Sequence, residues 1–401
     1  APWYTSGALS QKILTLLFLF GASFTLFFAL ASNALRAKAT CIILCLSALS
    51  PLASMIESVG KNDLSRFEDI ALKDTPNIHI ISVESLAAPV VIKKNLDLDT
   101  LAYEDTLKKN NILTYRNSFS SGFGTGLSLN TVMRLAQAGV SANVYDYFTG
   151  RTESPLGKIL KQNGYHLSTG FPMPFFSYAK GKYVDSFLPD TKKSIKNNTL
   201  CLLANAPVAS FFGFCSLVEL FDDSKGGQDD DWVGQVISII QSSEENTPAF
   251  TFHHILKPFK HTPGGFRTGN AEDTAEYREV FINQSKVAAD LIQTLHDTFQ
   301  TGDLGNSIVI LMGDHGVLMS NTIEYSDDPE FYVQDNYGIV LGILYNGTGC
   351  SGDVLTQYMD KISTPERLLG GLIKCLSTNP QKVEETFAFT EPHDLKSYPY
   401  Q

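Results

Sequence analysis

Apolar residues divide the chain into two parts of different character. No charged residue occurs between Lys12 and Arg36, where Leu, Phe and Ala dominate, and none occurs between Lys38 and Glu57. A helix that spans a bilayer needs about 20 consecutive apolar residues. The pattern therefore predicts a membrane anchor over residues 1–57, with transmembrane helices at about 13–35 and 39–56. A secretory signal is the alternative for the first stretch, although its apolar run would be shorter, and a buried core hairpin is the alternative for the second.

The short loop between the two apolar stretches carries Arg36 and Lys38. Positive charges in short loops mark the cytoplasmic side of a membrane protein. We therefore expect an inner-membrane protein whose remaining residues face the periplasm or the outside. Such a location permits disulfides. The simplest pairing of the four cysteines in this part is Cys201–Cys215 and Cys350–Cys375.

After residue 57, continuous apolar strands alternate with amphipathic helices. Residues 58–76 are predicted to form a linker, and the part that follows, 77–401, one catalytic domain. Buried strands are predicted at 77–83, 249–255, 307–312 and 338–345, and helices at 127–139, 277–299 and 364–376. This alternation is typical of an α/β fold in which a mainly parallel central sheet carries helices on both faces. The net charge of −11, without a basic stripe, argues against nucleic acid as a partner.

Polar residues follow three of the predicted strands. Glu84 comes after the first, "FTFHHI" leads to His254 and His261, and "SIVILMG" is followed by Asp314 and His315. Ligands of open α/β sheets bind beyond the carboxyl ends of the strands. Two carboxylates and an imidazole form a three-ligand set for a divalent metal with room for a fourth group. His254 is a weaker candidate because it could equally lie in the core.

The segment "SSGFGTGLSLNTVMRL" offers a hydroxyl as the fourth group. Thr125 follows two glycines and precedes a predicted helix that runs to about Ala138. A bound cation activates a hydroxyl as a nucleophile, and a helix N-terminus favours a phosphate. The alternative is that Thr125 or Ser128 merely caps this helix.

These motifs together resemble the alkaline phosphatase/sulfatase superfamily, and within it the membrane-anchored lipoteichoic acid synthases and lipid A phosphoethanolamine transferases. "IISVESL" is similar to the synthase segment with the metal-binding Glu, which falls on Glu84. "GFGTGLS" is similar to the transferase segment with the nucleophilic Thr, which falls on Thr125. "KHTPGGF" resembles the segment whose His contacts the transferred phosphate or a second metal, here His261, and "GDHGV" matches the metal pair Asp314 and His315. The resemblance spans roughly residues 77 to 378.

The resemblance implies transfer of a phospho-alcohol group, of the phosphoglycerol or phosphoethanolamine type, from a phospholipid donor to a glycan or lipid acceptor. Thr125 would carry the group as a phosphothreonine. One divalent ion, zinc or manganese, would be held by Glu84, Thr125, Asp314 and His315, and a second metal is left open. His261, and more weakly His254, would bind the substrate.

Two other functions are compatible with the same residues. A phosphodiesterase or phosphatase would use the same site with water in place of the acceptor. A non-enzymatic membrane protein is disfavoured because every expected metal position is filled. The sequence also departs from the family patterns. The Cys/Ser-x-Pro-x-Arg signature of sulfatases is absent around Thr125, "VESL" replaces the paired aspartates of two-metal members, and no further His follows "GDHG" closely.

Overall fold

A computed structural model describes eleven segments of the chain: 64–122, 124–135, 146–171, 181–188, 228–241, 247–256, 271–301, 306–317, 329–346, residue 350 and 363–387. The two predicted membrane helices, Cys201, Cys215 and His261 lie outside these residues. Within the described segments, no helix has the length and apolar character needed to cross a membrane.

A seven-stranded sheet forms the centre of the described region, in the order β2-β7-β6-β1-β5-β3-β4. Its strands are β1 (Asn77–Val83), β2 (Leu113–Thr114), β3 (His166–Gly170), β4 (Ser186–Leu188), β5 (Ala249–Ile255), β6 (Ser307–Gly313) and β7 (Leu341–Asn346). Five neighbouring strands, β4, β3, β5, β1 and β6, are parallel, whereas β7 is antiparallel to β6 and β2 is antiparallel to β7. The prediction of a mainly parallel sheet is confirmed, with one antiparallel edge.

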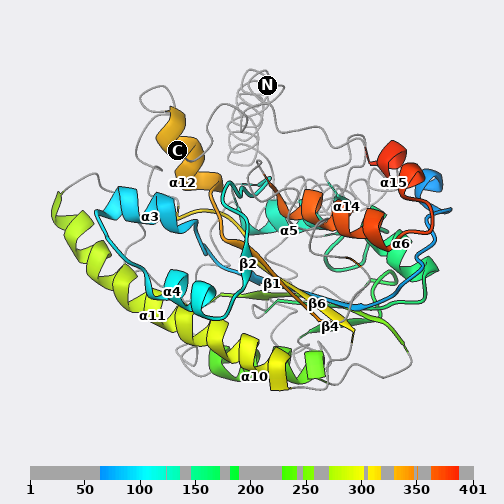
Figure 1. The fold of residues 1–401 in the computed structure, drawn as a ribbon, viewed down its shortest axis with the longest axis horizontal. Coiled ribbons are helices and arrows are strands. Elements are labelled where there is room, and N and C mark those ends of the chain that lie inside the picture. The colour runs from blue at the N-terminus through cyan, green and yellow to red at the C-terminus, as the bar shows by residue number, and fades with distance from the viewer. Residues whose placement is uncertain are drawn as a thin grey trace, which may run out of the picture. The chain divides into compact units, whose positions relative to one another are not determined.

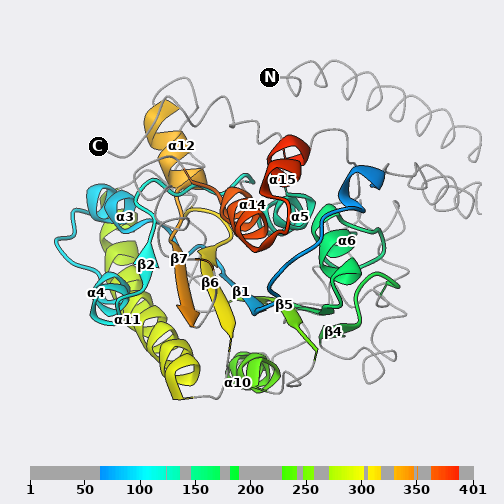
Figure 2. The same ribbon diagram turned by 45° about the vertical axis from the view of Figure 1, so that its right-hand side comes forward.

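Helices cover both faces of this sheet (Figures 1 and 2). One face packs against α5 (Thr125–Arg134), α6 (Pro155–Gln162), α14 (Pro365–Leu376) and α15 (Pro380–Thr386). The other packs against α3 (Pro89–Leu96), α4 (Ala102–Lys109), α10 (Gln228–Gln241) and α11 (Ala271–Thr301). Successive strand residues point to opposite faces, so Ile78 and Ile80 join the first core and Ile81 and Val83 the second. This explains why β1 is buried on both of its faces.

Two segments beside the sheet differ from their sequence prediction. Within the predicted linker 58–76, the described part contains a short 3-10 helix, η1 (Ser65–Phe67), and packs on the domain with Leu64, Phe67 and Ile70 buried. The predicted helix at 127–139 is α5, which ends at Arg134 because Leu135 adopts a left-handed backbone with φ 54°. The remaining helix, α12 (Pro329–Tyr337), leads into β7.

A disulfide joins Cys350, beyond β7, to Cys375 in α14. The Cα atoms are 5.8 Å apart, a usual separation for a disulfide. The predicted pairing of these two cysteines is confirmed, whereas the pairing of Cys201 with Cys215 stays a prediction.

Candidate active site

The carboxyl ends of three adjacent strands deliver the candidate site residues. In the parallel register, Ser82 of β1 pairs with His254 of β5, and Val83 pairs with Gly313 of β6. Glu84 therefore emerges beside His254 on one side and beside Asp314 on the other. The Glu84 N–H donates to the Ile255 carbonyl at 2.8 Å, which fixes its backbone to β5.

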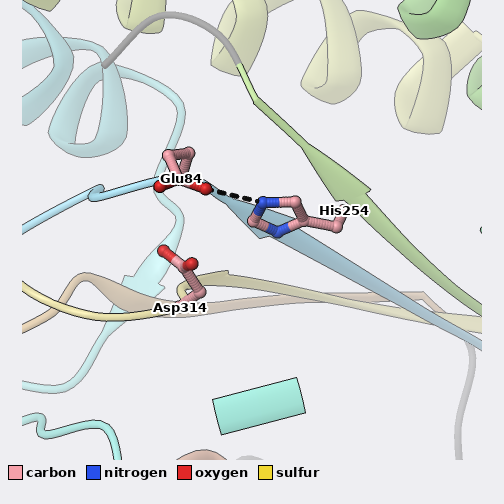
Figure 3. A group of neighbouring side chains, drawn as sticks. All are labelled: Glu84, His254 and Asp314. Atoms are coloured by element: carbon pink, nitrogen blue, oxygen red, sulfur yellow. Dashed lines mark hydrogen bonds and ion pairs between the residues drawn. The ribbon is translucent and has the colours of Figure 1, made fainter. Parts of the chain in front are cut away.

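Glu84, His254 and Asp314 converge as a buried cluster (Figure 3). One ligand atom from each of the three lies within 4.8 Å of the others, as a shared metal ion would require. His254 Nε2 is 3.0 Å from Glu84 Oε2. Two carboxylates and an imidazole are a suitable donor set for zinc or manganese.

Asp314 presents one oxygen to the protein and keeps the other available. Its Oδ1 accepts the N–H groups of Ser85 at 2.8 Å and His315 at 2.9 Å. Among the described residues, Oδ2 has no hydrogen-bond partner although the side chain is fully buried. The nearest charged group is His315 Nε2, 3.4 Å from Oδ2. A buried carboxylate oxygen that makes no hydrogen bond is suited to bind a cation, so the residues fit a metal ion.

His315 and Thr125 lie next to this cluster, at separations close to those between ligands of one metal ion. His315 Nε2 lies 3.4 Å from Asp314 Oδ2, 3.6 Å from Glu84 Oε1 and 3.5 Å from Thr125 Oγ1. Thr125 Oγ1 is 3.3 Å from Glu84 Oε2. Ligand atoms placed tetrahedrally at about 2.0–2.1 Å from an ion are themselves about 3.3 Å apart. Glu84, Thr125, Asp314 and His315 could therefore hold one ion with small adjustments, with His254 as a further ligand or as the hydrogen-bond partner of Glu84.

Glu84 and His315 each stabilise the charged form of the other. Burial alone would raise the pKa of Glu84, but its hydrogen bonds to His254 and His315 and their charges hold that pKa below the ordinary value. Burial alone would lower the pKa of His315, but the carboxylates of Asp314 and Glu84 raise it to about 9. The metal-free site thus pairs an anionic Glu84 with a cationic His315. A metal must displace the proton on Nε2 before His315 can bind it.

A second layer of contacts orients both imidazoles. His315 Nδ1 lies 2.7 Å from the Gly316 carbonyl, which requires a proton on Nδ1 and turns Nε2 toward the cluster. His254 Nδ1 is 3.1 Å from Ser82 Oγ, and the ring stacks on Phe171 with centroids 4.8 Å apart. These partners hold each ring in the orientation that a metal site needs.

The glycines of "GDHG" are required by close backbone approach. A Cβ at Gly313 would lie 2.2 Å from the Leu86 carbonyl oxygen, and one at Gly316 would lie 1.8 Å from the Asp335 carbonyl oxygen. The Gly316 N–H also donates to the Asn336 carbonyl at 2.9 Å, at the end of α12. Any larger residue would push the Asp314–His315 turn away from its neighbours.

Thr125 does not act as a helix cap. The N-cap of α5 is Gly124, and Thr125 is the first helical residue, with its hydroxyl directed to Glu84 and His315. Ser128 lies inside the helix, with its hydroxyl 2.9 Å from that of Ser120. Among the described residues no side chain caps α5, so its first-turn N–H groups are not satisfied by a side chain at the N-cap position.

The structure brings together the four residues that the sequence predicts as metal ligands: Glu84, Thr125, Asp314 and His315. It also places His254, the weaker candidate, in the same cluster. The alternation along β5 contains the signal for His254, because it lies on the same face as Phe250 and Phe252 and pairs with Ser82 beside Glu84. His261 lies outside the described residues. The fold and the buried cluster thus define an α/β domain with a candidate metal site.

A family model described as Sulfatase matches residues 76–348, more than half of the 401-residue chain. The chain therefore belongs to the sulfatase family, within the alkaline phosphatase/sulfatase superfamily. No curated protein matches it.

Solved structures of a bacterial periplasmic domain have the same fold. The C-terminal periplasmic domain of EcEptC from Escherichia coli, in a complex with Zn, has 13% identity and a TM-score of 0.53, covering 83% of this chain and 97% of that one. A second structure of that domain has 14% identity and a TM-score of 0.52, covering 80% and 90%. Lipooligosaccharide phosphoethanolamine transferase A from Neisseria meningitidis has 13% identity and a TM-score of 0.49, covering 95% and 71%. At these identities the likeness concerns the fold.

Proposed function

We propose that the protein is a metal-dependent phosphotransferase that moves a phosphoglycerol or phosphoethanolamine group from a phospholipid donor to a glycan or lipid acceptor. The observation that carries this proposal is the position of the Thr125 hydroxyl. It lies 3.3 Å from Glu84 and 3.5 Å from His315, at the first residue of a helix whose N-terminal N–H groups no described side chain caps. A nucleophile, a ligand cluster and anion-binding donors thus meet at one place.

The proposed metal ligands are Glu84, Thr125, Asp314 and His315, with His254 beside Glu84. One zinc or manganese ion is expected. When bound, it would lower the pKa of the Thr125 hydroxyl and offset the negative charge of the phosphoryl group. The complex of the EcEptC domain with Zn supports zinc as the first ion to test.

The Thr125 hydroxyl would give up its proton as Oγ attacks the phosphorus of the donor phosphodiester. The bond from phosphorus to the diacylglycerol oxygen breaks, and this oxygen takes up a proton as diacylglycerol leaves. The N–H groups at the start of α5 lie where phosphoryl oxygens can accept their hydrogen bonds. We assign His261, from its resemblance to the phosphate-contacting His, to bind those oxygens or to protonate the leaving group.

The acceptor hydroxyl completes the cycle by attacking the same phosphorus. It gives up its proton, the bond to Thr125 Oγ breaks, and the hydroxyl of Thr125 is restored. A membrane anchor over residues 1–57, with the domain facing the periplasm or the outside, would hold the site close to a lipid donor. Water in place of the acceptor would make the protein a phosphodiesterase on the same residues.

Donor turnover by matched threonine variants tests the proposal. The wild-type protein is incubated with phosphatidylglycerol or phosphatidylethanolamine, and release of diacylglycerol is measured. Thr125→Ala should abolish release, a loss of several powers of ten, while Glu84, Asp314 and His315 remain as metal ligands and keep most of the metal bound. The control is Thr131→Ala on the same helix, because the Thr131 hydroxyl bonds only the Leu127 carbonyl in the described structure, at 2.7 Å. Near-normal release by Thr125→Ala would overturn the proposal.

A further inference from the structure

A buried glutamate lies at the start of α14, on the face of the sheet that also carries α5. Glu366 is 2% exposed, although the neighbouring residues of its helix, such as Leu368 and Leu369, belong to an apolar core. Burial raises the pKa of its carboxyl group. A carboxyl group in such a place costs stability unless its bonds compensate, so its presence calls for a reason beyond packing.

Glu366 interacts with its own backbone N–H, with Thr364 beside it and with the charge of Arg134, and its partner in the loop before α5 is Ser121. The Ser121 hydroxyl donates to Glu366 Oε1 across 245 positions of sequence. Ser121 is half-buried and precedes the first residue of α5, Thr125, by four positions. Glu366 is therefore bonded to the loop that carries the candidate nucleophile, and not to the cluster of Glu84, Asp314 and His315.

The remainder of this loop is fixed by its backbone. Phe119 N–H donates to the Ser363 carbonyl at 2.9 Å, and Ser120 N–H donates to the Tyr337 carbonyl at 2.7 Å. The Ser120 hydroxyl donates to the Gly122 carbonyl at 2.8 Å and lies 2.9 Å from the hydroxyl of Ser128 in α5. The side chain of Ser121 adds a link from the tip of the loop to α14.

We propose that Glu366 and Ser121 form a positioning pair that holds the loop 118–122, and through it Thr125, at the metal cluster. The inference rests on the proposed role of Thr125 as nucleophile. Glu366 touches no reacting atom and acts through Ser121. A glutamate that served only the dipole of α14 would do so equally well on an exposed face of the first turn, whereas a link to the loop requires this buried position.

The pair is tested by Ser121→Ala, Glu366→Gln, Glu366→Ala and the double variant Ser121→Ala/Glu366→Ala. The measurements are kcat and KM for diacylglycerol release, zinc content, and hydrogen exchange of the amides in 118–122 and 124–129. The control is Ser285→Ala, which removes another buried serine hydroxyl, on α11 against the opposite face of the sheet.

We expect Ser121→Ala and Glu366→Ala to lower kcat by about 10- to 100-fold, since small displacements of reacting groups have effects of this size. KM and zinc content should change by less than about two-fold, and amide exchange should accelerate in the loop only. Glu366→Gln keeps the acceptor oxygen and should recover most of the lost kcat. The double variant should be no slower than the slower single variant, because the two residues act as one unit.

Ser121→Ala decides the matter even if Glu366→Ala fails to fold, because it removes only a hydroxyl from a half-buried loop. A kcat and a loop exchange rate equal to those of Ser285→Ala would overturn the positioning role. Hydrogen exchange does not depend on the chemistry of Thr125. If the loop exchanges faster but Thr125→Ala still turns over donor, the proposed function fails and the structural link stands.

Discussion

Removal of the Cys350–Cys375 disulfide should destabilise the domain by several kcal/mol. The two cysteines are separated by 25 residues. The loop-closure relation for a loop of this length gives about 3.5 kcal/mol at 25 °C, because the crosslink restricts the unfolded chain. Since the bond ties the segment beyond β7 to α14, its loss should also loosen the helix that carries Glu366.

Urea denaturation of Cys350→Ala/Cys375→Ala against the wild type measures this effect. Trp232 is a suitable reporter, because it is buried and donates its Nε1–H to the His254 carbonyl at 2.8 Å, next to the site. The midpoint should fall by about 1 M. Addition of a reductant to the double variant then reports only on the remaining cysteines, including the predicted pair Cys201–Cys215. An unchanged midpoint, or free thiols at Cys350 and Cys375 in the wild type, would refute the reasoning.

Three further predictions concern the cluster and the core beneath it. Asp314→Asn keeps the Oδ1 acceptor for the N–H groups of Ser85 and His315 but loses the negatively charged oxygen. Loss of a residue that only hydrogen-bonds a metal ligand lowers metal affinity roughly 10- to 100-fold, so loss of this ligand should lower it by more. Equal metal content of variant and wild type in elemental analysis after dialysis would contradict this. Gly316→Ala should cost about 1–3 kcal/mol, because its Cβ would meet the Asp335 carbonyl, and an unchanged thermal midpoint would contradict it. Burial lowers the pKa of His79 from 6.5 to about 4, so the unfolded chain takes up its proton first and stability should be lost as pH falls from 6.5 to 4, by about 3 kcal/mol. Burial also lowers the pKa of His253, to about 3, so His253 adds to the loss in the same window. His79→Leu should therefore reduce the loss of stability without removing it, and a profile parallel to the wild type would exclude His79 as a cause.

The strand ends that form the site could be predicted from sequence, because buried strands are short apolar runs and the polar residues that follow them are conspicuous. Glu84, Asp314 and His315 were found in this way. The direction of β7 could not be predicted, since a run of buried residues looks the same in a parallel and an antiparallel strand. The apolar run at 338–345 therefore predicts a strand, which is β7, but does not predict that it is antiparallel to β6.

Contacts between distant segments were the other part that sequence did not supply. His254 is a weaker candidate from sequence because "FHHI" could equally place it in the core, and the pairing with Ser82 shows that it lies beside Glu84. Likewise, nothing in "SSGFGTGLS" or "TPERLLGG" indicates that Ser121 and Glu366 meet. The first contact depends on which strands pair, and the second on how α14 packs on the sheet.

The central claim is that Thr125 carries the transferred group as a covalent intermediate. The most direct test is mass measurement of the peptide that contains Thr125, after the wild-type protein has been incubated with a defined phospholipid and no acceptor. We predict one added phospho-alcohol group on this residue, matching the head group of the lipid, and its loss when acceptor is supplied. Turnover of the lipid with an unmodified Thr125 peptide at every time point, or with the group on another residue, would contradict the account.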